Sequence, residues 1–168
     1  MDQRARPDRH PVGDAVGALT AGDVVREIAT AVQTLPGWRI SPFAAGNFPG
    51  DPEGWGHKAF TVEARSTRLA PGPESSRIRR AALGRADTAI AVRWIWRLPE
   101  GYQWSEYCAA LDGEAALLVA LTRVSGGPGS SDGLHVDWTD TISRQTVADG
   151  TWLLSEIAGT ARHMLTIQ

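Results

Sequence analysis

Apolar residues recur at helical spacing near the start of the chain. Four of them fall on one helical face: Val24, Ile28, Val32 and Leu35. Thr20 stands three residues before Asp23, in the arrangement of a capping box, and Pro36-Gly37 follows the last apolar position. This spacing predicts an amphipathic helix that begins near residue 20, ends near residue 35 and packs its apolar face on another element.

Three later stretches alternate between apolar and polar residues, which is the pattern of half-buried strands. They are "KAFTVEARS", the run from Thr88 to Leu98, and "LHVDWTDTISRQTV". In the middle run, the face predicted to enter the core carries Thr88, Ile90, Val92, Trp94, Trp96 and Leu98. The opposite face is mixed, with Ala89, Ala91, Arg93, Ile95 and Arg97, and is expected to lie under a helix edge or against another protein.

A second helix is predicted from about residue 103 to 122. Its apolar stripe is marked by Tyr107, Leu111, Leu118 and Leu121. "WRISPF" is a further short strand candidate, and Asp149-Gly150 predicts a hairpin turn before a last strand or bulged strand pair, "TWLLSEIAGTARHMLTI". The order predicts an α+β fold in which a mostly antiparallel sheet of four to five strands carries two helices packed on one face.

The length of 168 residues fits one domain. Residues 1–18 are polar and rich in Pro, Gly and Arg, so we expect a flexible N-terminal arm followed by a single α+β domain over residues 19–168. Two loops are candidates for partner contacts. The loop "AAGNFPGDPEGWGH" carries Phe48 and Trp55, and a long predicted loop from Thr67 to Gly84 carries an arginine cluster with Arg77, Arg79 and Arg80.

Composition narrows the class of function. The net charge of −2 and the pI near 6.1 argue against a general nucleic-acid binder. No stretch approaches the roughly 18 apolar residues of a membrane span, and the N-terminus lacks the apolar run of a signal peptide. Cys108 is the only cysteine, so no internal disulfide forms, and its position in a helical pattern predicts a small core residue.

Candidate chemistry is sparse. His135 and Asp137 share one strand face and, with Asp140 nearby, are the basis of an alternative hypothesis of a small metal-dependent enzyme. Alternation alone favours a solvated strand face, and no further ligands are evident nearby in the sequence. The sequence therefore predicts no catalytic, cofactor-binding or metal-binding residues. A monomeric ligand-binding α+β domain is a further alternative.

The order of elements resembles the tail-terminator proteins of long-tailed bacteriophages. Three segments carry the resemblance: "AGDVVREIATAVQTLPGW" as the opening helix, "TAIAVRWIWRLPEGYQWSEYCAALDGEAALLVAL" as strand and helix, and "DGTWLLSEIAGTARHML" as the closing strand. It covers about residues 20 to 166 and is a resemblance of arrangement, since none of the segments is a diagnostic motif. Neighbouring head–tail neck and connector proteins share such arrangements and are the nearest alternative.

The resemblance implies a structural virion protein and no enzyme. Such a protein forms a ring with itself, usually of six subunits, that caps the tail tube, stops its polymerisation and joins it to head-completion or stopper proteins. It implies no cofactor and no membrane, DNA only as passing cargo, and a place in the tail neck of the virion after assembly in the host cytoplasm. The residues predicted to make interfaces are Phe48, Trp55, Arg77, Arg79, Arg80, Arg93, Ile95 and Arg97.

Overall fold

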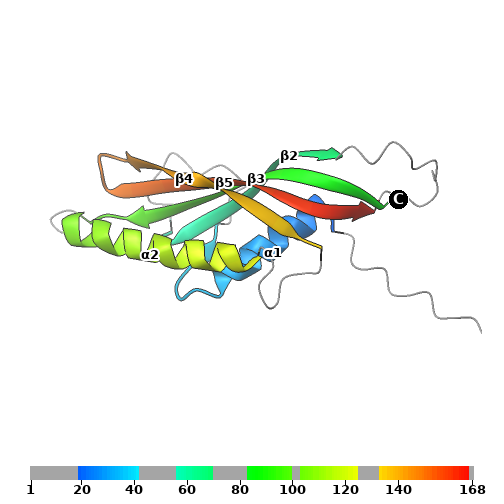
Figure 1. Cartoon of the computed structure of the whole chain (residues 1–168). Helices are drawn as coiled ribbons and strands as arrows, with labels where there is room; N and C mark the ends of the chain where they lie inside the picture. The colour runs from blue at the N-terminus through cyan, green and yellow to red at the C-terminus, as the bar shows by residue number, and fades with distance from the viewer. Residues whose placement is uncertain (1–18, 42–55, 70–82, 100–102, 125–132, 167–168) are drawn as a thin grey trace, which may run out of the picture.

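A computed structural model shows a five-stranded sheet with two helices on one of its faces (Figure 1). It describes residues 19–41, 56–69, 83–99, 103–124 and 133–166. The elements follow in the order α1 (Ala21–Gln33), β1 (Arg39–Ile40), β2 (Ala59–Leu69), β3 (Leu83–Arg97), α2 (Gln103–Val124), β4 (His135–Val147) and β5 (Trp152–Thr166). The predicted order of elements and the predicted fold class are confirmed. The predicted arm over residues 1–18 lies outside the described residues.

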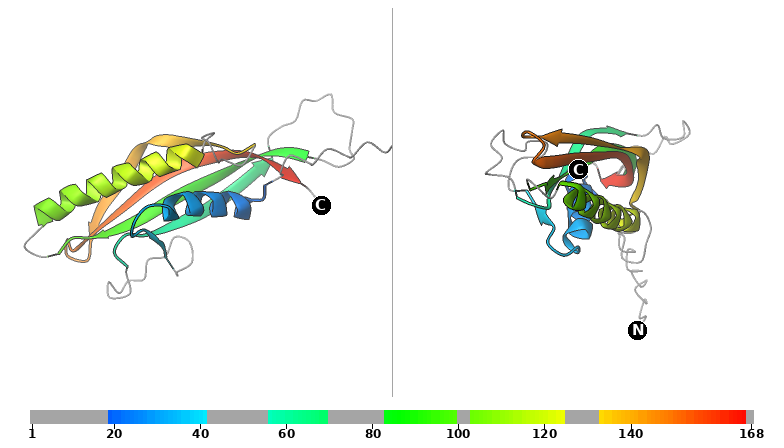
Figure 2. Two further views of the ribbon diagram at one scale, coloured as in Figure 1. Left: turned by 90° about the horizontal axis from the view of Figure 1, so that it is seen from below. Right: turned by 90° about the vertical axis from the view of Figure 1, so that its left-hand side faces the viewer.

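The strands lie in the spatial order β1-β2-β3-β5-β4, so β3 is central. Every neighbouring pair is antiparallel except β1 and β2, which are parallel. Viewed from below the sheet, α1 and α2 lie across the same face (Figure 2). The main hydrophobic core fills the space between these helices and the sheet.

The beginning of α1 is fixed by the predicted capping box. The Thr20 hydroxyl accepts a hydrogen bond from the Asp23 backbone N–H at 3.1 Å, and the Asp23 carboxylate accepts one from the Thr20 backbone N–H at 2.8 Å. Hydrogen bonds from Thr20, with help from Arg26, hold the pKa of Asp23 well below its ordinary value. Just before the helix, the carbonyl of Leu19 lies 2.8 Å from Nδ1 of the buried His163 on β5, which ties the start of α1 to the end of the sheet.

The predicted faces of β3 are confirmed on the core side. The side chains from Thr88 to Leu98 that alternate toward the helices are all buried, and Trp94 is 2% exposed. Trp96 lies against Gly113 of α2 so closely that a Cβ atom added there would be 2.9 Å from the Cη2 atom of the indole. The absence of a side chain at Gly113 therefore allows α2 to approach the sheet.

The predicted apolar stripe of α2 is rotated from the face that the structure buries. Of the predicted stripe, Leu121 is buried, whereas Tyr107, Leu111 and Leu118 are only partly buried. The buried positions of α2 are Ala110, Glu114, Leu117, Ala120, Leu121 and Val124. Gly113 faces the sheet because its lack of a side chain leaves room for the Trp96 ring of β3. Apolar residues occur all around α2, so periodicity alone did not identify this face.

One buried charge joins α2 to the edge strand β4. Glu114 is 4% exposed, and its carboxylate accepts hydrogen bonds from the guanidinium of Arg144 on β4. A buried carboxylate needs such a partner because leaving it unpaired in a low-dielectric interior is costly. The contact therefore fixes β4 under α2.

The predicted loop from Thr67 to Gly84 is wrong at both ends. β2 continues to Leu69 and β3 begins at Leu83, so its terminal residues are paired strand. A bulge at Arg65 shifts the alternation, because Ala64 pairs with Ile90 but Ser66 pairs with Ala89. The prediction missed the extension because the outer parts of both strands are exposed and polar.

Candidate functional site

The eight predicted interface residues divide into two groups. Phe48, Trp55, Arg77, Arg79 and Arg80 lie outside the described residues, and their proposed role stays a prediction. The other three lie on β3 and point away from the helices, onto what we call the far face of the sheet, as do their pairing partners on β2 and β5.

Ile95 is not available as a surface residue. It is 0% exposed and forms a second small core cluster with Ala59 of β2 and Trp152 of β5, against which Val147 and Ala148 pack. The expectation that Ile95 contacts another protein together with Arg93 and Arg97 is therefore corrected for Ile95. The β4–β5 hairpin places Trp152, Val147 and Ala148 over the far face, and alternation within β3 alone does not reveal this cover.

Arg93 lies in an ion-pair network at the middle of the far face. Glu156 of β5 accepts a hydrogen bond from Nε of Arg93 at 2.5 Å and one from Nη2 of Arg65 at 2.7 Å. Glu63 lies 3.5 Å from Nε of Arg65 and 4.0 Å from Nη1 of Arg93. Two carboxylates and two guanidiniums thus balance one another across β2, β3 and β5, so Arg93 does not present an isolated positive charge.

The network shifts the ionisation of Glu156. Burial alone raises the pKa of this carboxyl, but hydrogen bonds from Arg93 and Arg65, together with their charges, lower it below its ordinary value. A carboxyl whose pKa is lowered by folding stabilises the folded state above its unfolded pKa, which is about 4.3 for glutamate. That contribution is lost as the pH falls through the lower pKa of the folded state.

We expect Glu156→Gln to lower the melting temperature most at pH 7, with a cost of about 1 kcal/mol for this partly exposed network. The difference from wild type should narrow as the pH falls from 5 toward 3, because protonation removes the same charge from the native protein. Thermal melts by circular dichroism across this range provide the measurement. Asp112→Asn, on the exposed side of α2, is the control. A difference that stays constant with pH would contradict this role of Glu156.

Basic residues gather at the end of the sheet where α2 begins. Burial and the positive charges of Lys58, Arg39 and Arg97 lower the pKa of His57, although Glu106 of α2 opposes them. The ammonium of Lys58 lies 4.9 Å from the centroid of the Trp96 ring. Arg97 is exposed, and its backbone N–H donates to Nδ1 of His57 at 3.3 Å. Among the described residues around His57, basic groups therefore outnumber acidic ones.

Of the three residues of the enzyme hypothesis, the structure brings together His135 and Asp137 but not Asp140. Asp137 is paired on the far face, with Nη2 of Arg162 at 2.8 Å and Nε2 of His135 at 2.9 Å. Asp140 falls in a bulge of β4 and lines a pocket beside α2. Among the described residues, no group of three or more His, Cys, Asp or Glu side chains is placed to hold a metal ion.

The outer face of α2 is the more distinctive surface, and sequence analysis missed it. Trp104 is 78% exposed and Val119 is 52% exposed, and both fall on the same helical side. Cys108 and Ala115 lie between them and are also exposed, so the prediction of Cys108 as a core residue is wrong. We call these four residues the α2 stripe. The signal was present in the sequence, because a helix apolar on all sides has more apolar surface than one sheet can bury.

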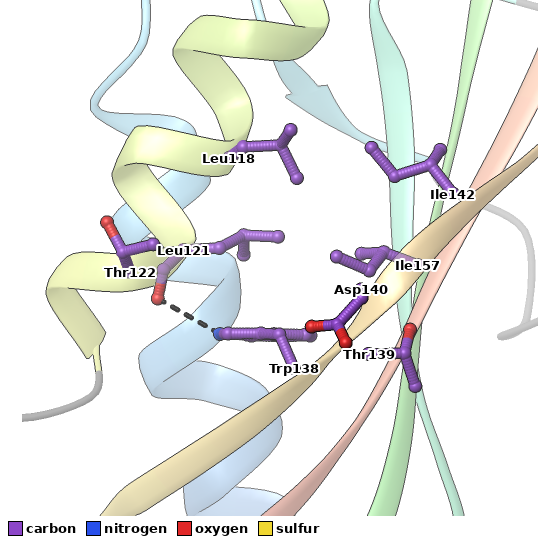
Figure 3. Close-up of a pocket in the computed structure, with 8 residues that line it drawn as sticks. All are labelled: Leu118, Leu121, Thr122, Trp138, Thr139, Asp140, Ile142 and Ile157. Atoms are coloured by element: carbon purple, nitrogen blue, oxygen red, sulfur yellow. Dashed lines mark hydrogen bonds between the residues drawn. The ribbon is translucent and has the colours of Figure 1, made fainter.

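A pocket of about 290 Å³ opens between α2 and β4 (Figure 3). Its lining consists of Leu118, Leu121, Thr122, Trp138, Thr139, Asp140, Ile142 and Ile157. Leu118 points toward Ile142 across the pocket, and the Trp138 ring closes one end. The Trp138 indole N–H donates to the Leu121 carbonyl at 3.3 Å, which satisfies one of the last carbonyls of α2.

The pocket exists because β4 departs from regular pairing. Trp138 pairs with Gly159 and Ile142 with Ile157, so β4 has more residues than β5 across this interval. Thr139 and Asp140, which lie in the bulge, line the pocket, and the Thr139 hydroxyl stabilises the bulge by donating to the Ala158 carbonyl at 3.1 Å. Gly159 is needed here because a Cβ atom would lie 2.8 Å from the Trp138 ring.

Comparison with known proteins adds no family. No protein-family model matches the chain, and no curated protein matches it in sequence. Neither helix that the structure describes is long and apolar enough to cross a membrane. The candidate functional features of the chain are therefore its surfaces: the α2 stripe, the pocket beside it and the charged far face.

Proposed function

We propose that this protein forms a ring with copies of itself and acts as a tail terminator, capping the tail tube of a long-tailed phage or a related particle. In this role the ring stops polymerisation of the tube and offers a docking face to a head-completion or stopper protein. The observation that carries the proposal is the α2 stripe, in which Trp104 and Val119 expose large apolar side chains on one side of the helix. Exposed apolar side chains that gather on one side of a helix are typical of protein–protein contacts.

A ring built by rotation requires two different complementary surfaces on each subunit. The α2 stripe lies on the outer side of the helical layer, and the pocket opens between α2 and β4 beside the last turns of the same helix. The network of Glu63, Arg65, Arg93 and Glu156 occupies the other side of the sheet. The subunit thus has distinct apolar and charged surfaces, which support unequal contacts with neighbours and with other partners.

Charge also suits a protein that lets DNA pass. The chain has a net charge of −2, and Arg65 and Arg93 are paired with carboxylates. Strong binding to DNA comes from unpaired basic groups that contact phosphates, so a balanced surface holds DNA weakly. This balance on the far face supports DNA that passes that face as cargo and is not held there as a bound partner.

The proposed function predicts a change in tube assembly. Tubes grown from the tube protein of the same particle should stop at uniform ends when the purified protein is added, because a ring on the growing end blocks further subunits. Negative-stain electron microscopy measures the tube lengths. An unrelated soluble protein at the same concentration is the control. Tubes of unchanged length without rings at their ends would contradict the terminator role, and rings that form without capping tubes would favour a neighbouring neck protein.

A further inference from the structure

The geometry points to a specific contact between subunits. We propose that Trp104 of one copy inserts into the pocket between α2 and β4 of the next copy, so that copies associate head to tail. The inference deepens the proposed function and rests on it for its biological role.

Trp104 has the properties of an anchor residue. Its side chain is 78% exposed in the first turn of α2. The ring stacks beside Tyr107, with centroids 6.5 Å apart and an angle of 26° between the ring planes. The stacking restricts the indole, so less conformational entropy is lost when it enters a partner. Exposed tryptophans are among the residues most enriched at the energetic centres of interfaces.

The pocket has the chemistry to hold an indole. Leu118, Ile142 and Ile157 provide apolar walls, and the volume of about 290 Å³ exceeds the roughly 150 Å³ of an engineered cavity that holds benzene. Asp140 is exposed at the pocket and makes no hydrogen bond or ion pair with another described residue. Its carboxylate is therefore free to accept the indole N–H, the one hydrogen-bond donor of a tryptophan side chain.

Trp104 cannot occupy the pocket of its own chain. At about 1.5 Å of rise per residue, it lies roughly 20 Å along the helix axis from Leu118. That separation is beyond the reach of one side chain within a continuous helix. Trp104 and the pocket that receives it must therefore come from different copies. Such a contact is heterologous, and it closes into a ring when the rotation between copies permits.

Electrostatics also favours head-to-tail association of the two copies. Trp104 lies in the first turn of α2, at the positive end of the helix dipole, with the acidic Glu106 in the same turn. The pocket lies near the C-terminal end of α2, where the helix dipole is negative, and Asp140 is the one charged residue of its lining, although Arg123 lies in the last turn of the helix. Head-to-tail contact brings these opposite partial charges together, whereas head-to-head contact separates them.

The test uses two variants that each remove one half of the contact. Trp104→Ala removes the knob and keeps the pocket, and Thr122→Trp keeps the knob and adds an indole at the pocket mouth from an exposed position. Sedimentation velocity of the whole protein should show each variant associating about 30-fold or more weakly than wild type, which is the effect of losing an anchor residue. Asp140→Lys, which reverses the charge at the pocket, should also weaken association.

Mixing the two variants gives the sharper result. We expect an equimolar mixture to form a 1:1 pair that grows no further, because only one knob and one open pocket can meet. Leu69→Ala, which trims an exposed apolar side chain on β2, should associate as wild type does. Wild type that remains monomeric at all soluble concentrations, or a Trp104→Ala variant that associates normally, would overturn the contact.

Failure of this contact is distinguishable from failure of the proposed function. If Trp104→Ala caps tubes as well as wild type does, the Trp104 contact is refuted and the terminator role is not. If wild type fails to cap tubes, the terminator role is refuted. The mixing experiment would still show whether Trp104 of one copy enters the pocket of another.

Discussion

Trp94→Ala is expected to lower the free energy of unfolding by about 3–5 kcal/mol, because it leaves a cavity at the centre of the core. Trp94 is almost fully buried on the central strand β3, between the sheet and the helices. A loss of this size is a large part of the stability of a typical domain. Urea unfolding followed by circular dichroism provides the measurement.

A second tryptophan serves as the matched control. Trp104→Ala removes the same side chain from an exposed site, and its monomer should unfold within about 0.5 kcal/mol of wild type. Both melts are made at low protein concentration, where association contributes nothing to stability. If Trp94→Ala and Trp104→Ala cost the same, the faces of β3 and α2 have been assigned incorrectly.

Gly113→Ala is expected to destabilise the protein by about 3 kcal/mol, although alanine ordinarily stabilises the middle of a helix by about 1 kcal/mol over glycine. The added methyl group would overlap the Trp96 ring, which is rigid and itself buried. Either α2 moves away from β3 or Trp96 leaves its rotamer, and both disturb the core. Thermal and urea unfolding measure the loss.

Two further variants separate this overlap from helix propensity. Ala116→Gly, at an exposed position of the same helix, should cost about 1 kcal/mol through propensity alone. Trp96→Leu removes the ring that the added methyl group would meet, so Gly113→Ala should cost far less in that background than in wild type. Equal costs in the two backgrounds would show that the close approach of Gly113 and Trp96 does not limit the packing.

Several features of the fold could be predicted because they depend on local chemistry. The capping box at Thr20 and Asp23 is formed by residues three apart, and the turn at Asp149-Gly150 requires left-handed backbone angles that this pair tolerates. Alternation placed Trp94 in the core because side chains on a strand point to opposite faces in turn. Each of these depends on neighbours in sequence.

Other features depend on contacts between distant segments. Ile95 alternates to the far face, yet it is buried because Trp152 and the β4–β5 turn cover it there. The side of α2 that is buried depends on the space that Gly113 leaves for the Trp96 ring, and the periodicity of the sequence does not reveal this contact. The pocket beside α2 depends on how many residues β4 and β5 place between two pairs, so it could not be predicted before the register was known.

The surfaces of α2 link these observations to assembly. The same helix uses small residues such as Gly113 to approach the sheet and places Trp104 in solvent on its other side. An exposed apolar side on a helix lowers the solubility of an isolated monomer. In the proposed ring this side is covered when copies associate. The proposed ring explains why apolar residues occur all around α2 when one side would be enough for the core.

Native mass spectrometry of the wild-type protein, alone and with its tube protein, shows whether the subunits form a closed ring. A closed ring should give one oligomeric mass whose subunit number does not change as the protein concentration rises, and Trp104→Ala should shift that species to monomer. A protein that remains monomeric in both conditions, or that gives an open series of masses growing with concentration, would contradict the proposal.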